Sequence, residues 1–422
     1  MTPASPLRVL IAPDSFKGSL SADAVAREIE LGLHESMGRA VRTRAVPIAD
    51  GGEGTLDVLL ARDGAREHSI RTVDALGRPR IGRFGLLPHG GAVIEAAEAN
   101  GLPHVQDIPL QPLEAHSYGV GLLVRAALDQ GAEEILLTVG GSASTDAGVG
   151  LLRTLGARFL DESGAEVPPG GGSLAAIVHI DVSGVIESAR QARWRVACDV
   201  DSPLTGPRGA AAVFGPQKGA SPEDVATLDA GLRSFARLLR DTTGVDPAGV
   251  PGGGAAGGIP ALLRCVFGAE LIPGTKLVAD ILDLVHAVQQ SDLVITGEGT
   301  LDPPSLRGKA PGAVAALARS QGVPVVALAG SVTLTPNELR DAGIIAAISL
   351  AEGPAELADL IANAPMLIRS AARRIGSLIL LGMTHSTQSL AAADPLLSLP
   401  LEPTPVESDP SRTIKGEGSW SM

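Results

Sequence analysis

The chain has 422 residues, 45% of them hydrophobic and 19% charged, and its formal net charge is −13 at pH 7. This length predicts roughly two domains, and the acidic balance argues against nucleic-acid binding, which favours a basic face. The two cysteines, Cys198 and Cys265, are far apart and show neither metal-ligand spacing nor a disulfide framework. We expect a cytoplasmic protein without membrane contact, because no secretory signal and no apolar run of about 20 residues is present.

The N-terminal part predicts a strand, a helix and a second strand. Residues 7–13 form a short continuous apolar run, as expected of a strand that is covered on both faces. Ser19 or Ser21 is a candidate cap for a helix over 22–35, where apolar residues recur at helical spacing. Residues 41–50 give the second strand, and this alternation predicts a parallel sheet.

The same pattern returns near the C-terminus. It predicts a strand over 291–299, a helix over 310–322, a strand over 323–332 and one more strand over 343–352. The chain between these two parts carries short strands, prolines and glycine-rich loops. We therefore expect an α/β protein in which a second α/β domain is inserted into a parallel-sheet domain.

The expected domain limits follow from these changes of pattern. The parallel-sheet domain is expected to be discontinuous, over 1–70 and 281–383, with the inserted domain over 71–280. Residues 119–141 predict a helix and a strand that fit either domain. The segment 384–422 is rich in Pro, Ser and charge, and we expect a disordered C-terminal tail there.

Five apolar strands run into polar, glycine-rich turns. The turns are APDSFKGS (12–19), ADGGEGT (49–55), VGGSASTDAGVG (139–150), ACDVDSPLTGPRGAAAVFGPQKG (197–219) and TGEGTLDPPSLRGKAPG (296–312). Ligands of open parallel sheets bind beyond the carboxyl ends of the strands. The five turns are therefore expected to converge on one cleft.

These turns supply groups that suit a phosphorylated ligand. Backbone N–H groups of glycine-rich turns cradle phosphate oxygens, and carboxylates at strand ends hold Mg²⁺ or take a proton from a hydroxyl group. The hydroxyl and carboxyl groups are those of Ser142, Ser144, Thr145, Asp14, Asp50, Glu53, Asp199, Asp201, Glu298 and Asp302.

The lysines of these turns are the most suggestive feature. The chain has 29 arginines but only 5 lysines, and Lys17, Lys218 and Lys309 lie in the turns. A compact point charge suits the neutralisation of a phosphate.

Simpler interpretations stay open for single turns. Glycine-rich turns are common, Glu53 fits a solvated side chain, and Asp199 and Asp201 fit one exposed polar face. The P-loop, the GxGxxG fingerprint and the protein-kinase motifs are absent. The residues alone thus predict a two-domain α/β enzyme with an acidic, lysine-lined cleft that handles phosphate, without indicating its substrate.

Taken together and in this order, the motifs resemble the bacterial type I glycerate kinase family. The blocks are APDSFKGSLSA, ADGGEGT, GGSASTDAGVGLL, ACDVDSPLTGPRGAAAVFGPQKGA, GGGAAGGIPALL and DLVITGEGTLDPPSLRGKAPGAVA, and the resemblance covers residues 7–375. It implies ATP-dependent phosphorylation of D-glycerate to 2-phosphoglycerate or 3-phosphoglycerate with Mg²⁺. It also implies a Rossmann-like domain that is interrupted by a second α/β domain, with the active site between them.

The chain departs from the family pattern at three places. The family often has Asn-Asp-Gly where this chain has Thr145, Asp146 and Ala147, and often has Arg and Gln where this chain has Thr300 and Pro304. The residues after Lys309 also differ from the usual ones. These changes affect the fine geometry of the loops and remove no carboxylate or lysine.

The resemblance leads to hypotheses for individual residues. Lys17, Asp199 and Asp14 are the expected catalytic residues: Lys17 neutralises charge, Asp199 is the general base and Asp14 orients substrate or metal. The substrate is expected to contact Ser15, Asp50, Gly141, Ser142 and Ser144. ATP is expected to contact Gly297, Glu298, Gly299 and Lys309, with Asp201 and Glu298 as Mg²⁺ ligands.

Alternatives remain at this stage. A phosphotransferase for another small hydroxy acid and a non-catalytic ligand-binding relative both fit the pattern. The position that is phosphorylated and the oligomeric state stay open, with a homo-oligomer among the options.

Overall fold

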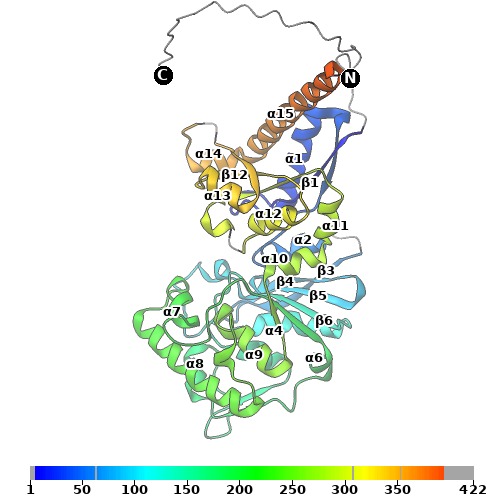
Figure 1. The fold of residues 1–422 in the computed structure, drawn as a ribbon. Coiled ribbons are helices and arrows are strands. Elements are labelled where there is room, and N and C mark those ends of the chain that lie inside the picture. The colour runs from blue at the N-terminus through cyan, green and yellow to red at the C-terminus, as the bar shows by residue number, and fades with distance from the viewer. Residues whose placement is uncertain (1–4, 62–63, 307, 352, 394–422) are drawn as a thin grey trace, which may run out of the picture. The chain divides into compact units, whose positions relative to one another are not determined.

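The computed structural model describes residues 5–61, 64–306, 308–351 and 353–393. Two main sheets, each with parallel strands and packed helices, make up most of the described chain (Figure 1). The α/β class that the sequence predicts is therefore confirmed.

The first sheet contains five parallel strands in the order β13-β12-β11-β1-β2. Strand β1 pairs with β11 on one side and with β2, the edge strand, on the other, and its Leu10 and Ile11 are fully buried. The strands are β1 (Leu7–Ile11), β2 (Val41–Ala45), β11 (Leu293–Leu301), β12 (Val325–Val332) and β13 (Ile344–Ser349).

The helices of this part begin where the sequence indicates. Helix α1 (Ala22–Met37) starts after Ser21, whose Oγ accepts a hydrogen bond from Ala24 N at 3.3 Å. Helices α12 (Ala310–Ser320) and α13 (Pro336–Ala342) pack against β11 to β13, and α14 spans Leu357–Ala362. Helix α15 spans Ala364–Ala393 and so continues past Thr384, where the tail was expected to begin; residues 394–422 of that expected tail lie outside the described residues.

The second sheet has six strands in the order β10-β9-β6-β5-β4-β3. Strands β3, β4 and β5 pair antiparallel, and the pairs from β5 to β10 are parallel. The strands are β3 (Arg66–Val73), β4 (Pro79–Leu86), β5 (Gly91–Glu95), β6 (Glu134–Thr138), β9 (Arg193–Ala197) and β10 (Glu270–Ile272). All six come from the chain between β2 and β11, while the exact domain limits at residues 70 and 280 stay a prediction.

Helices cover the second sheet as well. The strand that fitted either domain is β6, and its preceding helix α4 (Tyr118–Asp129) packs against β3 to β5. The other helices are α2 (Thr55–Leu60), α3 (Ala97–Asn100), α5 (Val149–Thr154), α6 (Glu187–Gln191), α7 (Ala210–Phe214), α8 (Pro222–Thr243), α9 (Ile259–Phe267), α10 (Gly274–Ile281) and α11 (Leu284–Gln289). Strands β7 (Arg158–Leu160) and β8 (His179–Asp181) form a small antiparallel pair.

The first part of the predicted turn over 296–312 belongs to a strand. The segment GEGTL continues β11 to Leu301, because Gly297, Glu298 and Thr300 pair with residues of β12. A side chain at Gly297 would overlap the carbonyl oxygen of Leu328, so glycine permits this close pairing. The polar turn therefore begins at Asp302.

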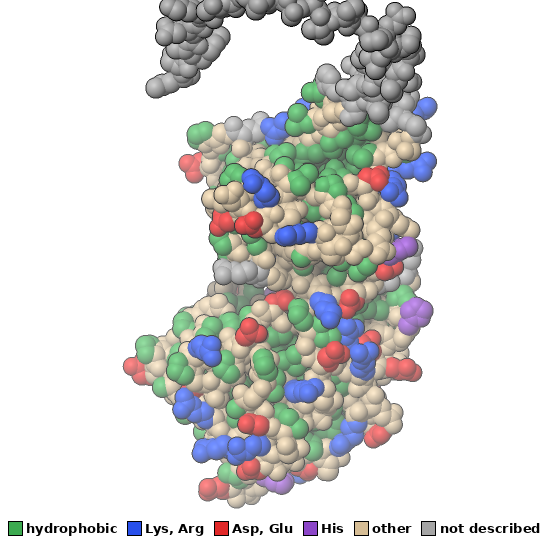
Figure 2. Space-filling view, viewed as in Figure 1, with side chains coloured by type: hydrophobic (Ala, Val, Ile, Leu, Met, Phe, Trp, Pro, Cys, Tyr) green, Lys and Arg blue, Asp and Glu red, His purple; other side chains and the backbone are tan. Residues whose placement is uncertain are grey.

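The visible surface carries charged side chains of both signs. On the face shown in Figure 2, Lys and Arg side chains are interspersed with Asp and Glu. None of the described helices combines the length and the apolar character needed to cross a membrane.

Candidate active site

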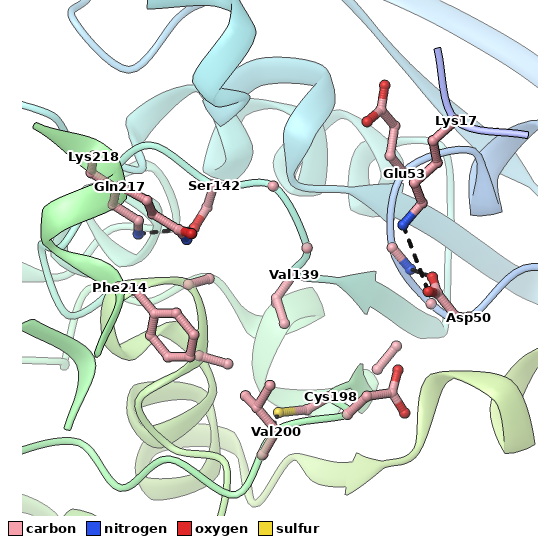
Figure 3. Close-up of a pocket in the computed structure, with 18 residues that line it drawn as sticks. Lys17, Asp50, Glu53, Val139, Ser142, Cys198, Val200, Phe214, Gln217 and Lys218 are labelled. Atoms are coloured by element: carbon pink, nitrogen blue, oxygen red, sulfur yellow. Dashed lines mark hydrogen bonds and ion pairs between the residues drawn. The ribbon is translucent and has the colours of Figure 1, made fainter. Parts of the chain in front are cut away.

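A pocket lies beyond the carboxyl ends of strands from both sheets. The turns after β1, β2, β6 and β9 reach it, and its volume is about 360 Å³. Five of the predicted site residues line it, namely Lys17, Asp50, Gly141, Ser142 and Asp199. Lys17, Asp50 and Ser142 are labelled in Figure 3. The predicted convergence of turns therefore occurs for these residues.

Glycines allow the turns to approach one another. A Cβ at Gly51 would lie 2.6 Å from Gly274 Cα, and a Cβ at Gly140 would lie 2.9 Å from Gly52 Cα. Such short distances exclude any side chain without movement of backbone. The glycine-rich composition of these turns thus has a packing reason at this pocket.

Lys17 and Asp50 form an ion pair at the pocket. Lys17 Nζ lies 3.8 Å from Asp50 Oδ2, and the Lys17 side chain is 64% exposed. Asp50 Oδ1 accepts a hydrogen bond from Gly52 N at 3.0 Å, which fixes the carboxylate over its own turn. An exposed ion pair of this kind contributes little to stability, so its charges remain available to a ligand.

Asp14 and Ser15 lie beside the pocket. They line a neighbouring cavity of about 140 Å³, which shares Glu53 with the larger pocket. Asp14 is buried and its Oδ1 accepts a hydrogen bond from Ser15 N at 2.6 Å. Burial, followed by the negative charge of Asp50, raises the pKa of Asp14 to about 7.

Asp199 and Asp201 differ in their surroundings, although they are two residues apart. Asp199 Oδ1 accepts a hydrogen bond from Gly274 N at 2.9 Å, at the start of α10. Desolvation, with a smaller contribution from the charge of Asp50, raises the pKa of Asp199 to about 6, and the hydrogen bond from Gly274 N opposes this rise. Asp201 is exposed and does not line the pocket.

Ser142 and Ser144 also differ in their surroundings. Ser142 lines the pocket, whereas the Ser144 hydroxyl is fully buried and accepts a hydrogen bond from Asn100 Nδ2 at 2.8 Å. Ser144 Oγ in turn donates to Asp146 Oδ1 at 3.2 Å. Ser144 therefore holds its own turn together, and its expected contact with substrate has no support from the position of its hydroxyl.

Asp146 is the anchor of that turn. Its carboxylate is 1% exposed and accepts hydrogen bonds from five donors: Ser117 N, Ser117 Oγ, Ser144 Oγ, Gly148 N and Gly150 N. The sequence interpretation noted Asp146 only as part of a variable tripeptide. Asp146 lies three residues before Val149, where α5 begins, and aspartate commonly accepts hydrogen bonds from nearby backbone N–H groups in such turns, which was the available signal.

The residues expected to bind ATP form a separate group. Glu298 is buried on β11, and Lys309 Nζ lies 4.0 Å from Glu298 Oε2. Glu298 Oε1 has no hydrogen-bond partner among the described residues, and burial raises the pKa of this side chain. The backbone of Gly297 is committed to the sheet, since its oxygen accepts a hydrogen bond from Asp14 N at 2.8 Å. Neither Gly297 nor Gly299 lines the 360 Å³ pocket.

Three residues in or near the site were not among the catalytic, substrate-binding or ATP-binding residues assigned from the sequence, although Lys218 was one of the lysines noted in the turns. Lys218 is buried against the pocket and Phe214 forms part of its wall. Glu95 accepts hydrogen bonds from Gly54 N and Leu56 N, at 3.2 and 3.1 Å, and so caps α2. The scarcity of lysine was a signal for Lys218, while nothing in the local sequence singles out Phe214 or Glu95.

The fold and the pocket define an α/β enzyme with a small, charged site at the ends of its parallel strands. A model of the glycerate kinase family matches residues 9–380. The chain is 42% identical to a glycerate kinase of Bacillus subtilis (strain 168) over 379 residues, which cover 90% of this chain and 99% of that protein. The chain therefore belongs to the glycerate kinase family, and it is a kinase.

Further relatives agree with this assignment. A protein named glycerate 2-kinase from Escherichia coli (strain K12) is 39% identical over 381 residues, covering 90% of this chain and 100% of that protein. A crystal structure of a protein provisionally named glycerate kinase 2, from Salmonella typhimurium LT2, superposes with a TM-score of 0.82 at 39% identity. It covers 90% of this chain and 100% of that chain, so the similarity in fold extends over nearly the whole described protein.

Proposed function

We propose that the chain catalyses the ATP-dependent phosphorylation of D-glycerate to 2-phosphoglycerate or 3-phosphoglycerate. The names of its relatives support the substrate. The observation that carries the proposal is the pocket in which Asp199, the Lys17–Asp50 pair and Ser142 meet. At about 360 Å³ it is near the lower end of ligand-pocket volumes, as suits a small acid.

Asp199 is the proposed general base. Its Oδ1 is held by Gly274 N, which leaves Oδ2 free to take the proton of the attacking hydroxyl group. With a pKa raised toward about 6, Asp199 is ionised at neutral pH and yet more basic than an ordinary aspartate.

Lys17 and Asp14 have supporting roles in this proposal. The ammonium group of Lys17 neutralises negative charge on the transferred phosphoryl group, from a turn that is open to solvent. Asp14 holds the start of this turn through Ser15 N and places a second carboxyl group near Asp50. Most of the rate enhancement then comes from positioning and charge stabilisation.

Glu298 and Lys309 are the residues that fit Mg²⁺ and ATP. The orphaned, buried Oε1 of Glu298 suits a cation or a donor group, and Lys309 suits a phosphate oxygen. Mg²⁺, when bound, neutralises phosphate charge. In the described residues no three His, Cys, Asp or Glu side chains form a metal-binding group. Mg²⁺ usually binds through one or two carboxylates together with substrate phosphates, so Glu298 would share the ion with ATP. Asp201 as a second ligand stays a prediction.

The test is a turnover assay with Mg²⁺ and ATP against a panel of acids. ADP release is measured with D-glycerate, L-glycerate and longer aldonates, and ³¹P NMR identifies the product. D-glycerate is expected to give the highest kcat/KM, and the phosphorus–proton coupling shows whether the secondary or the primary hydroxyl group carries the phosphate. Higher kcat/KM with a longer aldonate would move the assignment to another hydroxy acid, and no turnover with any acid would overturn the proposal.

A further inference from the structure

Lys218 is the one buried lysine among the described residues. It ends the 3₁₀ helix Pro216–Lys218 and is only 3% exposed, whereas Lys17 and Lys276 are exposed and Lys309 is partly exposed. Its side chain nevertheless lines the 360 Å³ pocket, next to Ser142 (Figure 3). The ammonium group is therefore presented to the pocket from the protein interior.

The hydrogen-bond partners of Lys218 are neutral. Nζ donates to Ser142 Oγ at 3.2 Å and to the Ser144 carbonyl oxygen at 2.6 Å. A lysine ammonium group has three N–H donors, so one of them remains. No carboxylate of the described residues forms an ion pair with Lys218.

Such a charge is costly unless something compensates it. Burial lowers the pKa of Lys218 to about 8, and the attraction of Asp146 only partly opposes this. Asp146 does not bond Lys218, because its own carboxylate accepts from Ser117, Ser144, Gly148 and Gly150. An anion that enters the pocket would complete the coordination of this lysine.

Ser142 adds a second donor at the same place. Its Oγ accepts from Lys218, and no acceptor for its own hydroxyl proton is found within the described part of the chain. One N–H of Lys218 and one O–H of Ser142 therefore remain for an incoming group. Two adjacent donors match the two oxygens of a carboxylate.

We propose that Lys218 and Ser142 form the subsite that binds the carboxylate of the hydroxy acid. Phe214 and Ala256 supply an apolar wall for the carbon chain of this acid. In Figure 3 Lys218 and Ser142 lie on one side of the pocket, and Lys17 and Asp50 lie on the other. The bound acid thus extends its hydroxyl groups from Lys218 toward the charged pair. This inference rests on the proposed function.

The subsite makes the acid group a requirement. A neutral analogue such as glyceramide or glycerol would leave the buried ammonium group without an anion, and sites of this kind discriminate strongly against ligands that leave a buried polar group unpaired. The competing assignment is a phosphate group of the nucleotide at Lys218. The two differ in which ligand loses affinity when the charge is removed.

The test compares Lys218→Met with the exposed Lys276→Met as the matched control. Charge-assisted hydrogen bonds of this type are worth a factor of about 100, so kcat/KM for D-glycerate is expected to fall by about 100-fold in Lys218→Met. The KM of Lys218→Met for ATP is expected to stay at the wild-type value. The control Lys276→Met is expected to keep the wild-type preference for D-glycerate over glyceramide. Ser142→Ala, which leaves the buried charge in place, is expected to raise the KM for D-glycerate by about tenfold.

Binding is also measured without turnover. Thermal shifts of wild type and Lys218→Met are recorded with D-glycerate, glyceramide and ADP. Loss of the D-glycerate shift alone supports the subsite, even if the wild type proves to phosphorylate a different acid. An unchanged preference for D-glycerate over glyceramide in Lys218→Met overturns it, and so does loss of the ADP shift with retention of the D-glycerate shift.

Discussion

The turn after β2 and the turn after β6 both carry an aspartate, and the two aspartates serve different ends. Asp50 is partly exposed, pairs with Lys17 and faces the pocket. Asp146 is 1% exposed and is surrounded by five donors from its own turn and from the start of α4. A carboxylate with spare acceptor capacity at a pocket can act on a ligand, whereas one with all its capacity used holds the backbone in place.

The largest expected effect tests the anchoring half of this comparison. Asp146→Ala removes the acceptor of five buried donors, and each unsatisfied donor costs about 1–3 kcal/mol. We expect the free energy of unfolding to fall by about 4 kcal/mol or more, measured by urea denaturation. The control Asp241→Ala, at an exposed position of α8, should change it by less than about 0.5 kcal/mol. A similar small change in Asp146→Ala would show that the network does not anchor the turn.

The second prediction concerns the contact that holds Asp199. A Cβ at Gly274 would overlap the Asp50 carbonyl oxygen and lie 2.8 Å from Asp199 Oδ2. Gly274→Ala is therefore expected to displace Asp199 and to lower kcat/KM by about 100-fold, because small misplacements of catalytic groups are costly. In Gly249→Ala the new methyl group meets no neighbour, so kcat/KM should be unchanged. Equal kcat/KM in both variants would show that Gly274 does not position Asp199 for catalysis.

The third prediction uses pH. Asp50 raises the pKa of both Asp14 and Asp199, after the larger effect of burial. The kcat/KM of the wild type should fall as these carboxylates are protonated, below about pH 7 for Asp14 and below about pH 6 for Asp199. Asp50→Asn removes a negative charge. The acid limb of its profile of kcat/KM against pH should therefore lie at lower pH, even if the maximum kcat/KM changes as well. A shift to higher pH would contradict the arrangement of charges.

The smallest effect concerns Glu95, which caps α2 beneath the Asp50 turn. Burial raises its pKa to about 7, so the folded state binds its proton more tightly than the unfolded state does. Stability linked to Glu95 therefore increases as the pH falls from 8 toward 5. In the wild type, Glu95 should make the free energy of unfolding, measured by urea denaturation, higher at pH 5.5 than at pH 8 by an amount on the order of 1 kcal/mol. In Glu95→Gln this part of the pH dependence should disappear. A variant that keeps the full pH dependence would show that Glu95 is not its source.

The sequence predicts the elements around the site well, because their signals are local. The apolar run of β1, the cap at Ser21 and the alternation of strands and helices are confirmed by the structure. The convergence of turns also follows from general rules for parallel sheets. It holds for the turns that carry Lys17, Asp50 and Asp199.

Other features depend on tertiary packing and leave no local signal. Ser142 and Ser144 have the same chemistry and lie in one turn, yet only Ser142 reaches the pocket, since Asn100 and Asp146 take the hydroxyl of Ser144. The GEG segment suggests a turn, but its glycines permit close pairing of β11 with β12. The burial of Lys218 likewise arises from residues far away in the sequence.

The most direct test of the account is the turnover number of Asp199→Asn with D-glycerate and Mg²⁺–ATP. Loss of the general base is expected to lower kcat by about 100-fold or more, with the thermal stability and the KM for ATP close to wild type. Asp201→Asn, which alters an exposed carboxylate outside the pocket lining, should lower kcat by less. Near-normal turnover in Asp199→Asn would contradict the central claim that this pocket performs the chemistry through Asp199.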